Sequence, residues 1–140
     1  MKILEVLTKR RKIGNYGEKM AARHLKRSGY RIRERNFVAG DAEIDLIAEN
    51  REVLAFIEVK TRTLGHESPK EPRPASAVDC KKQRKILSAS RFYPGFYRSG
   101  KHVRYDIIEV YLENTEKPHI HEIKHLKGAF DGDTAYRRKL

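Results

Sequence analysis

Residues 43–60, EIDLIAENREVLAFIEVK, constrain the fold more than any other stretch of the chain. The runs 44–48 and 53–59 are apolar and rich in β-branched residues, which predicts two strands joined by the short turn 49–52. Asn50 in this turn is a residue type that adopts a positive φ readily, as short hairpin loops require. Because both runs are apolar on both faces, the strands should be central in a sheet and covered on each side.

Four charged side chains interrupt this apolar hairpin. Side chains alternate along a strand, so Glu43 and Asp45 share a face, and Glu58 and Lys60 share a face of the next strand. An even-numbered loop brings these two faces together, whereas a shift by one residue would separate them. A charge in a buried strand needs a partner, a metal ion or access to water. The hairpin therefore predicts three carboxylates and one lysine converging at one end.

Such a cluster of carboxylate oxygens suits a hard cation, and we expect Mg²⁺ or Mn²⁺ rather than zinc. The ion would relieve the repulsion between the carboxylates, which otherwise raises their pKa values. It can also turn a bound water into a nucleophile against a phosphodiester, with Lys60 orienting that water or stabilising the developing charge. The alternative is a surface hairpin on which the glutamate and lysine side chains form ordinary salt bridges.

The charge of the chain indicates a polyanionic partner. Its 140 residues are enough for one domain with a proper core. The 31 lysines and arginines against 19 acidic residues give a net charge of +12, which favours nucleic acid first and an anionic membrane second. No segment is apolar enough to span a bilayer, and the short apolar run at the N-terminus carries an acidic residue, unlike a signal peptide. The single cysteine, Cys80, excludes an internal disulfide and predicts a cytoplasmic protein.

The rest of the chain predicts further helices and strands. Residues 13–28 carry an apolar stripe at helical spacing, and a glycine follows to end that helix. Residues 30–37 alternate as an outer strand, residues 102–112 form an interior strand, and residues 119–126 form an edge strand. With a second helix between the third and fourth strands, the order is α-β-β-β-α-β-β. A single α/β domain, with a central mixed sheet flanked by a helix on each face, accommodates that order.

The second helix should begin after Ser76, with Asp79 at the capping-box position. One of its sides is strongly basic, which makes it either a solvated face or a surface that contacts phosphates. The candidate contacts to nucleic acid are Lys81, Lys82, Gln83, Arg84 and Lys85, together with Arg62 beside the hairpin. The basic cluster at residues 9–12, before the first helix, has the same two interpretations.

Three other segments are less informative. Residues 63–74 contain three prolines and form a long loop next to the charged end of the hairpin, either a lid or plain disorder. The histidines at 119, 121 and 125 share one strand face, and their spacing suits a solvated edge better than a zinc site. Residues 131–140, beyond a domain that comprises residues 1–130, form a basic tail that we expect to be loose.

Short segments along residues 10–130 match a known protein family. They are GNYGE at 14–18, GYRI at 29–32, EIDLIA at 43–48, FIEVKTR at 56–62, AVD at 77–79 and RYD at 104–106. With this order of motifs the chain resembles the restriction-endonuclease-like, or PD-(D/E)xK, nuclease core. It resembles more closely the YraN family, also called UPF0102, whose fold is similar to that of archaeal Holliday junction resolvases.

The resemblance implies roles for particular residues. Glu18, which periodicity alone leaves as an ordinary first-turn acid, falls on the first-helix glutamate of the nuclease core. Asp45 and Glu58 match the metal-binding acids of that core, and Lys60 matches its motif lysine. The backbone carbonyl of Val59 would be a further metal ligand. Lys82 or Gln83 would lie where such nucleases place a polar helix residue near the scissile phosphate, and Glu43 would be an additional acid.

Functions from different classes are compatible with this sequence. The first is a Mg²⁺-dependent endonuclease acting on DNA, with branched or structured DNA as a candidate substrate. Cutting both strands of a junction needs two sites, so a symmetric homodimer is expected with this function. The second is a non-catalytic module that binds DNA or structured RNA through the same basic surface. The intact set of two acids and a lysine favours the enzyme, because binding alone does not require it. A protein-interaction role ranks last.

Overall fold

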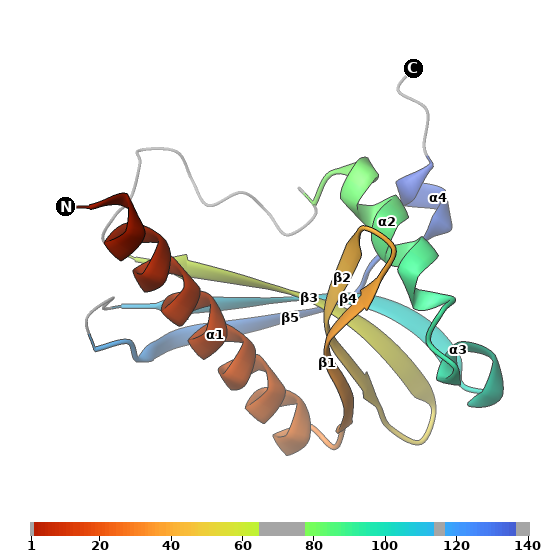
Figure 1. Ribbon diagram of the computed structural model, residues 1–140. Coiled ribbons are helices and arrows are strands. Elements are labelled where there is room, and N and C mark those ends of the chain that lie inside the picture. The colour runs from red at the N-terminus through yellow and green to blue at the C-terminus, as the bar shows by residue number, and fades with distance from the viewer. Residues whose placement is uncertain (1, 65–77, 114–116, 137–140) are drawn as a thin grey trace.

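A five-stranded sheet forms the centre of the computed structural model, which describes residues 2–64, 78–113 and 117–136 (Figure 1). Its strands lie side by side in sequence order, as β1 (Arg31–Ala39), β2 (Ala42–Glu49), β3 (Val53–Thr63), β4 (His102–Leu112) and β5 (Ile120–Phe130). The helices are α1 (Ile3–Arg27), α2 (Cys80–Ser90), α3 (Gly95–Arg98) and α4 (Gly132–Ala135). Only β3 and β4 pair in parallel, and α2 and α3 lie in the crossover that such a pair requires.

Alternation along the strands produces two cores, one on each face of the sheet. Leu46 and Ile57 pack with α1 on one face, whereas Ile47 and Phe56 pack with α2 on the other. All four side chains are at most 1% exposed, and burial of a side chain of this size contributes about 1.5–3 kcal/mol. The predicted single α/β domain, with a central mixed sheet and a helix on each face, is confirmed.

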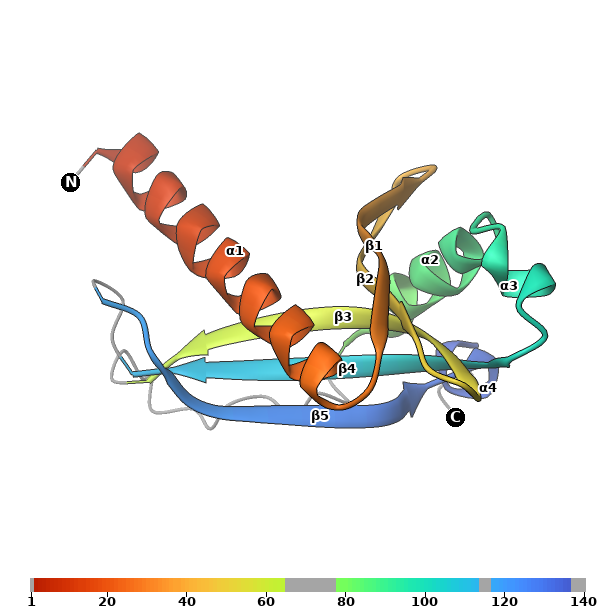
Figure 2. The ribbon, with the colours of Figure 1, turned by 90° about the horizontal axis from the view of Figure 1, so that it is seen from below.

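Helix α1 begins at Ile3, well before the predicted start near residue 13. The sequence pattern missed the first turns because Ile3 and Leu4 are 78% and 74% exposed, so no buried stripe marks them. In Figure 2 these turns stand away from the strands. The basic cluster at residues 9–12 therefore lies inside the helix, not before it. No helix in the described part of the chain, α1 included, is long and apolar enough to cross a membrane.

A glycine in α1 allows this helix to approach β3 closely. A Cβ atom on Gly17 would collide with Oγ1 of Thr61, so any larger residue there would push the helix away. A Cβ atom on Gly14, about one turn earlier, would meet only open space, so that position carries no such constraint. The close approach at Gly17 determines how far the next residue, Glu18, lies from the strands.

The β2–β3 turn has the predicted even number of residues, because 50–53 separate the last paired residues, Glu49 and Leu54. It is closed in a different way from the one predicted. Oδ1 of Asn50 accepts hydrogen bonds from the backbone N–H groups of Glu52, at 3.0 Å, and Val53, at 2.8 Å. The prediction of a positive φ at Asn50 is wrong, because this side chain closes the turn instead. The register that follows pairs Leu46 with Ile57, which places residues 45 and 58 next to each other beyond the last pair.

The cap of α2 differs from the predicted one. The side chain of Asp79 accepts a hydrogen bond from the backbone N–H of Lys82 at 2.8 Å, so Asp79 is itself the N-cap. Ser76, the predicted cap, lies outside the described residues. Of the predicted loop at 63–74, Thr63 still belongs to β3 and most of the rest lies outside the described residues as well.

The last part of the chain contains more structure than the sequence pattern predicts. β5 continues to Phe130, and α4 lies within the segment that was expected to be a loose tail. Nε of Arg84 on α2 donates to the carbonyl oxygen of Ala135 at 2.6 Å, which holds α4 against α2. Residues 137–140 lie outside the described part of the chain.

The three histidines near β5 do not share one environment. His119 and His121 are exposed, and their ring nitrogens lie 2.6 and 2.7 Å from the carboxylate oxygens of Glu113. His125 is 6% exposed, and its Nε2 lies 2.8 Å from Oδ2 of the buried Asp106. The expectation of a solvated edge is therefore wrong for His125, because the ring of His24 on α1 lies over it with the ring centroids 5.6 Å apart.

Candidate active site

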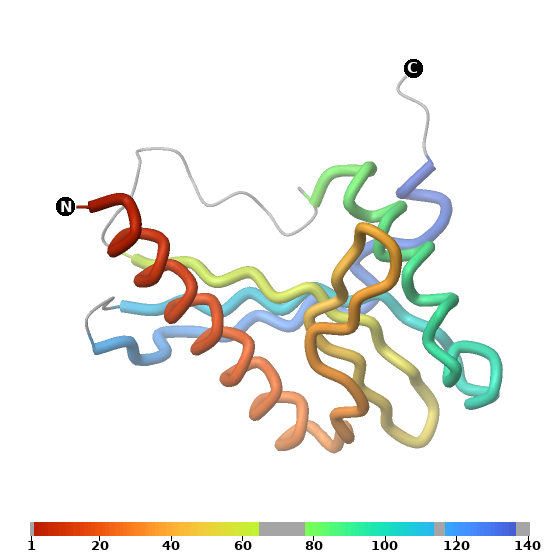
Figure 3. The backbone as a smooth tube through the Cα atoms, viewed as in Figure 1, coloured from red at the N-terminus to blue at the C-terminus, as the bar shows by residue number. Residues whose placement is uncertain are grey.

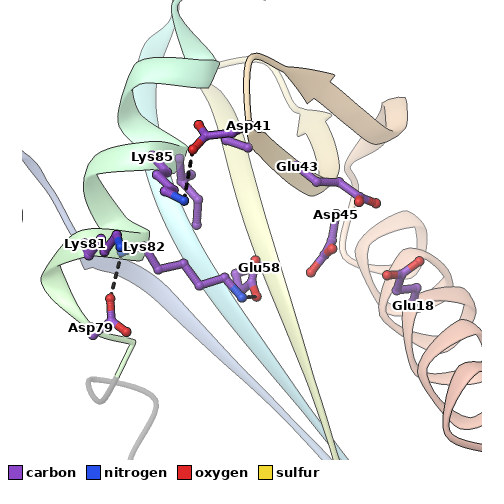
Figure 4. A pocket seen from close by; sticks show the side chains of 11 residues that line it. Glu18, Asp41, Glu43, Asp45, Glu58, Asp79, Lys81, Lys82 and Lys85 are labelled. Carbon is purple, nitrogen blue, oxygen red and sulfur yellow. Dashed lines mark hydrogen bonds and ion pairs between the residues drawn. The ribbon is translucent and has the colours of Figure 1, made fainter. Parts of the chain in front are cut away.

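The candidate site lies where α1, the β1–β2 hairpin, β3 and α2 meet. In Figure 3 the tip of the β1–β2 hairpin (orange) lies beside α2, and an ion pair of 3.1 Å between Asp41 and Lys85 joins the two. An open cavity of about 590 Å³ occupies this place (Figure 4). Its lining residues are Glu18, Asp41, Ala42, Glu43, Asp45, Glu58, Asp79, Lys81, Lys82, Lys85 and Ile86.

Asp45 and Glu58 meet because of the β2–β3 register. Both side chains line the cavity, as the alternation of the two strands and the even-numbered turn predict. Oδ2 of Asp45 accepts a hydrogen bond from the backbone N–H of Val59 at 2.8 Å. This bond crosses from β2 to β3 just beyond their last paired residues and fixes the Asp45 carboxylate beside Glu58.

Glu18 and Glu43 extend the acidic cluster. Figure 4 shows Glu18 on α1 facing the end of β2, where Glu43 and Asp45 are placed. With its amide nitrogen turned toward these carboxylates, Asn36 donates to Oε2 of Glu18 at 3.2 Å and to Oε1 of Glu43 at 3.0 Å. Asn36 has a φ of 52°, and asparagine tolerates this left-handed conformation better than other non-glycine residues.

Asn36 is a site residue that the sequence reasoning missed. An asparagine inside an otherwise alternating strand was the available signal, because this residue type is depleted in strands and enriched at positive φ. Asp41 was also missed, and its ion pair with Lys85 on α2 depends on tertiary contacts that no local pattern reveals.

The acids of the cluster raise one another's pKa values. Burial, followed by the negative charges of Glu58 and Glu18, raises the pKa of Asp45 from 3.8 to about 7. Burial, followed by the charges of Glu43 and Glu58, also raises the pKa of Glu18. Both shifts follow first from burial and second from the negative charge of the neighbouring acids.

Two lysines supply positive charge at Glu58. Nζ of Lys82 donates to Oε1 of Glu58 at 2.5 Å, and Nζ of Lys60 lies 3.5 Å from the same oxygen. Burial opposes the charge of Lys82, but its bond to Glu58 outweighs this and raises the pKa of Lys82. Burial and the nearby charge of Lys82 lower the pKa of Lys60 despite the attraction of Glu58.

The cluster has the donor atoms that a hard cation prefers, since Glu18, Asp45 and Glu58 all offer carboxylate oxygens. In the part of the chain that the structure describes, no three Asp, Glu, His or Cys side chains are grouped closely enough to hold a metal ion as they stand. The carboxylate of Glu58 instead forms an ion pair with the ammonium of Lys82. The donor atoms are of the kind that a divalent cation binds, but holding one would require the carboxylates to move closer together and Lys82 to leave Glu58.

The residues predicted to contact nucleic acid do not all lie on one exposed surface. Lys81 and Lys85 line the cavity with Lys82. Gln83 is 6% exposed, and its Nε2 donates to the carbonyl oxygen of Val78 at 2.7 Å, so it does not share the exposed basic side of α2. Arg84 is held by α4, as described above, and Nε of Arg62 is buried without a hydrogen-bond partner among the described residues. Of the predicted contacts, Lys81, Lys82 and Lys85 are thus the ones that line the cavity.

Comparison with known proteins agrees with the sequence motifs. A model of the family described as "Uncharacterised protein family UPF0102" matches residues 17–110. A UPF0102 protein of Caldanaerobacter subterraneus subsp. tengcongensis is 42% identical over 119 residues, which cover 84% of this chain and 93% of that protein. UPF0102 proteins of Persephonella marina and Clostridium perfringens are 40% and 37% identical, and the matches cover 86% and 84% of this chain and 94% and 93% of theirs. The chain belongs to the UPF0102 family.

Proposed function

We propose that this protein is a Mg²⁺- or Mn²⁺-dependent endonuclease that acts on DNA, with branched or structured DNA as the candidate substrate. One observation carries the proposal: Glu18, Asp45 and Glu58 converge on one open cavity that lysines also line. Burial and the neighbouring acids raise the pKa of Asp45 to about 7, and strongly shifted carboxylates in an open cavity are common at functional sites.

The acids would hold the cation, with Glu43 as an additional acid at the rim of the cavity. A divalent ion bound there would supply an activated water as the nucleophile for phosphodiester hydrolysis. Asp45 is oriented by the N–H of Val59, and the carbonyl of Val59 is the candidate backbone ligand. The net positive charge of +12 would bring a polyanionic substrate to the cavity.

The lysines have separable roles in this proposal. Lys60 is 29% exposed beside Glu58, and its lowered pKa suits a group that orients water or stabilises charge on the phosphorane. Lys82 is 44% exposed and has a long, flexible side chain, so it can exchange Glu58 for a phosphate oxygen when substrate and cation arrive. Lys81 and Lys85 would contact the adjoining phosphates.

A second candidate is a non-catalytic protein that binds nucleic acid through the same surface. The pairing of Glu58 with Lys82 favours it, because this ion pair already compensates the carboxylate that a metal would need. A symmetric dimer is proposed only with the enzymatic function, since two cuts in a junction require two sites.

Cleavage assays separate these candidates. The purified protein is incubated with linear duplex, single-stranded and four-way DNA in Mg²⁺, Mn²⁺ or EDTA, beside Asp45→Ala and Lys60→Ala. Glu52→Ala, in the exposed β2–β3 turn, is the matched control for removal of an acid outside the cavity. The enzyme predicts metal-dependent cutting that is lost by more than about 100-fold in Asp45→Ala and Lys60→Ala and kept in the control. Equal binding by all four proteins without any cutting supports the binding module instead.

A further inference from the structure

The segment from the end of α2 through α3 exposes two aromatic rings, Phe92 in the turn and Tyr97 in α3. Phe92 and Tyr97 are 70% and 71% exposed. Their neighbours Tyr93 and Phe96 turn inward and pack on Phe56, with ring centroids 6.1 and 6.2 Å from that of Phe56. Tyr93 and Phe96 therefore anchor this segment in the core, while Phe92 and Tyr97 face outward. The packing of α2 on the sheet does not require the two exposed rings.

The charge around these rings is positive. The chain carries no acidic residue between Asp79 and Asp106, and the exposed Arg91 and Arg98 flank the two rings. Arg33 of β1 lies close enough to hydrogen-bond Tyr93 of the same turn, which raises the pKa of Arg33. Exposed aromatic rings among arginines are the features that single-stranded nucleic acids use, since bases stack on the rings while phosphates meet the cations.

The helix connects this turn to the cavity. Lys81, Lys85, Ser88 and Phe92 follow one another at intervals of four, three and four residues, which places them along one side of α2. The N–H of Phe92 bonds to the carbonyl oxygen of Ala89 at 3.1 Å, so the helical path continues to the ring. Lys81 and Lys85 line the cavity, and one continuous stripe thus leads from the acids to Phe92.

The length of this stripe can be expressed in nucleotides. At 1.5 Å per residue, the backbone of Phe92 lies about 15 Å along the helix from that of Lys82. Stacked nucleotides of one strand are about 3.4 Å apart, so this distance corresponds to about four base steps.

We propose that Phe92 and Tyr97 form a stacking surface for unpaired bases of the nucleic acid strand whose phosphate enters the cavity. The inference deepens the proposed function and rests on it, because it assigns that site a substrate with unpaired nucleotides about four steps from the phosphate in the cavity. The faces of a base inside an intact duplex are covered by its neighbours and cannot stack on these rings. Single-stranded, forked or branched substrates are therefore favoured over uninterrupted duplex.

The test measures binding in EDTA, so that it does not depend on cleavage. Fluorescence anisotropy is recorded with single-stranded DNA and RNA oligonucleotides and with a blunt duplex of the same sequence. Phe92→Ala and Tyr97→Ala are each expected to weaken single-strand binding by about 5- to 150-fold and duplex binding by less than about 2-fold. Phe92→Tyr keeps a ring and should restore the affinity. Leu4→Ala, at a residue that is 74% exposed on α1, is the control for loss of an exposed apolar side chain.

Several results would overturn the proposal, and they differ from failure of the proposed function. Unchanged single-strand binding in both ring variants, or an equal loss on duplex, excludes stacking even if the wild-type protein cuts DNA. A change in the sedimentation mass of Phe92→Ala with unchanged oligonucleotide binding assigns the rings to a protein contact and also overturns it. If the wild-type protein does not cut DNA but the ring variants bind single strands selectively more weakly, the stacking surface is supported. The protein is then a binding module and not an enzyme. A stronger defect with RNA than with DNA supports it with RNA as the strand.

Discussion

The ammonium nitrogen of Lys82 lies 2.5 Å from Oε1 of Glu58, so this carboxylate of the acidic cavity is paired with a lysine. Glu58 is only 5% exposed, whereas the side chain of Lys82 is 44% exposed. The carboxylate is therefore fixed by β3 while the lysine that compensates it can leave. An incoming cation would compete with Lys82 for the same oxygen, so the ion pair is both a support for the metal-free fold and an obstacle to metal binding.

Replacing this lysine should separate the two effects. Lys82→Met removes a charge-assisted hydrogen bond to a buried carboxylate, and we expect the free energy of unfolding in EDTA to fall by about 1–2 kcal/mol after allowance for solvent screening. The Mg²⁺-induced rise in melting temperature should become larger than in the wild-type protein, because no ammonium competes for Glu58. Thermal unfolding with EDTA and with Mg²⁺ measures both quantities.

The matched control is Lys101→Met. Nζ of Lys101 lies 3.0 Å from Oε2 of Glu49, a similar half-buried pair outside the cavity. This variant should lose comparable stability without any change in its response to Mg²⁺. A smaller Mg²⁺ response in Lys82→Met than in the wild-type protein would show that the two cations do not compete.

Asp45 gives the cavity a characteristic pH dependence. Its pKa is raised from 3.8 to about 7, so between these values the folded protein binds its proton more tightly than the unfolded chain does. In the absence of metal, this group therefore makes the fold less stable as pH rises from about 4 to about 7, by about 2–4 kcal/mol in total. Asp45→Asn should lack that decline, because the amide oxygen still accepts from Val59 but cannot ionise.

Urea unfolding of the wild-type protein and Asp45→Asn at about pH 5 and pH 8 measures the effect as a difference between the two proteins. Carboxylates away from the cavity also change stability in this range, and their contributions cancel in that difference. Glu52→Gln, in the exposed turn, should follow the wild-type curve. A wild-type protein that gains stability over Asp45→Asn toward pH 8 would contradict the assignment of Asp45 as an uncompensated acid.

The convergence of Asp45 and Glu58 could be predicted from the sequence, because it depends on local rules. Strand alternation has a period of two residues, and an even-numbered turn preserves the matching of the faces. The turn formed as required even though Asn50 closes it by its side chain and not by a positive φ. The prediction that Asp45 and Glu58 face the same side therefore depends on the even number of turn residues and not on the φ of Asn50.

The places of Glu18, Gln83 and His125 could not be predicted from periodicity, because each depends on a distant element. Glu18 reaches the acids only because Gly17 lets α1 approach β3. Gln83 looked like part of a basic exposed side, but Thr134 in α4 donates to its Oε1 at 3.1 Å, and the side chain is buried there. His125 is covered by α1. Only the family resemblance identified Glu18 as a candidate, because the periodicity of the helix gave it no special role.

Asp106 should dominate the acid sensitivity of the fold. It is fully buried, and it accepts from Arg104 through both oxygens at 2.8 Å and from the N–H of Gly128 at 2.9 Å, with His125 at 2.8 Å. Burial alone would raise its pKa, but His125, Arg104 and Gly128 outweigh burial and lower it. The stability that Asp106 provides is therefore present above about pH 4 and lost as pH falls through the depressed pKa.

Asp106→Asn should lower the free energy of unfolding by about 3 kcal/mol at neutral pH, because it leaves the guanidinium of Arg104 uncompensated. The wild-type protein should show a steep acid transition in far-UV circular dichroism below about pH 4, and the variant should lack it. Glu113→Gln is the control, since Glu113 also contacts two histidines but on an exposed surface. Its effect should stay within about 0.5 kcal/mol, and a comparable loss in both variants would rule out burial as the cause.

Two glycines of α1 offer a matched test of how Glu18 is placed. Gly14→Ala meets open space and should stabilise the protein by about 0.5–1 kcal/mol through helix propensity. Gly17→Ala gains the same propensity but drives its Cβ into Oγ1 of Thr61, and we expect a net loss of about 1–3 kcal/mol. Because the helix must move away from β3, Glu18 should also withdraw from Asp45, so Gly17→Ala should show a weaker Mg²⁺-induced rise in melting temperature while Gly14→Ala keeps it. Urea unfolding and thermal unfolding of the two variants measure this contrast, and equal stability with equal Mg²⁺ responses would show that the contact at Gly17 does not set the position of Glu18.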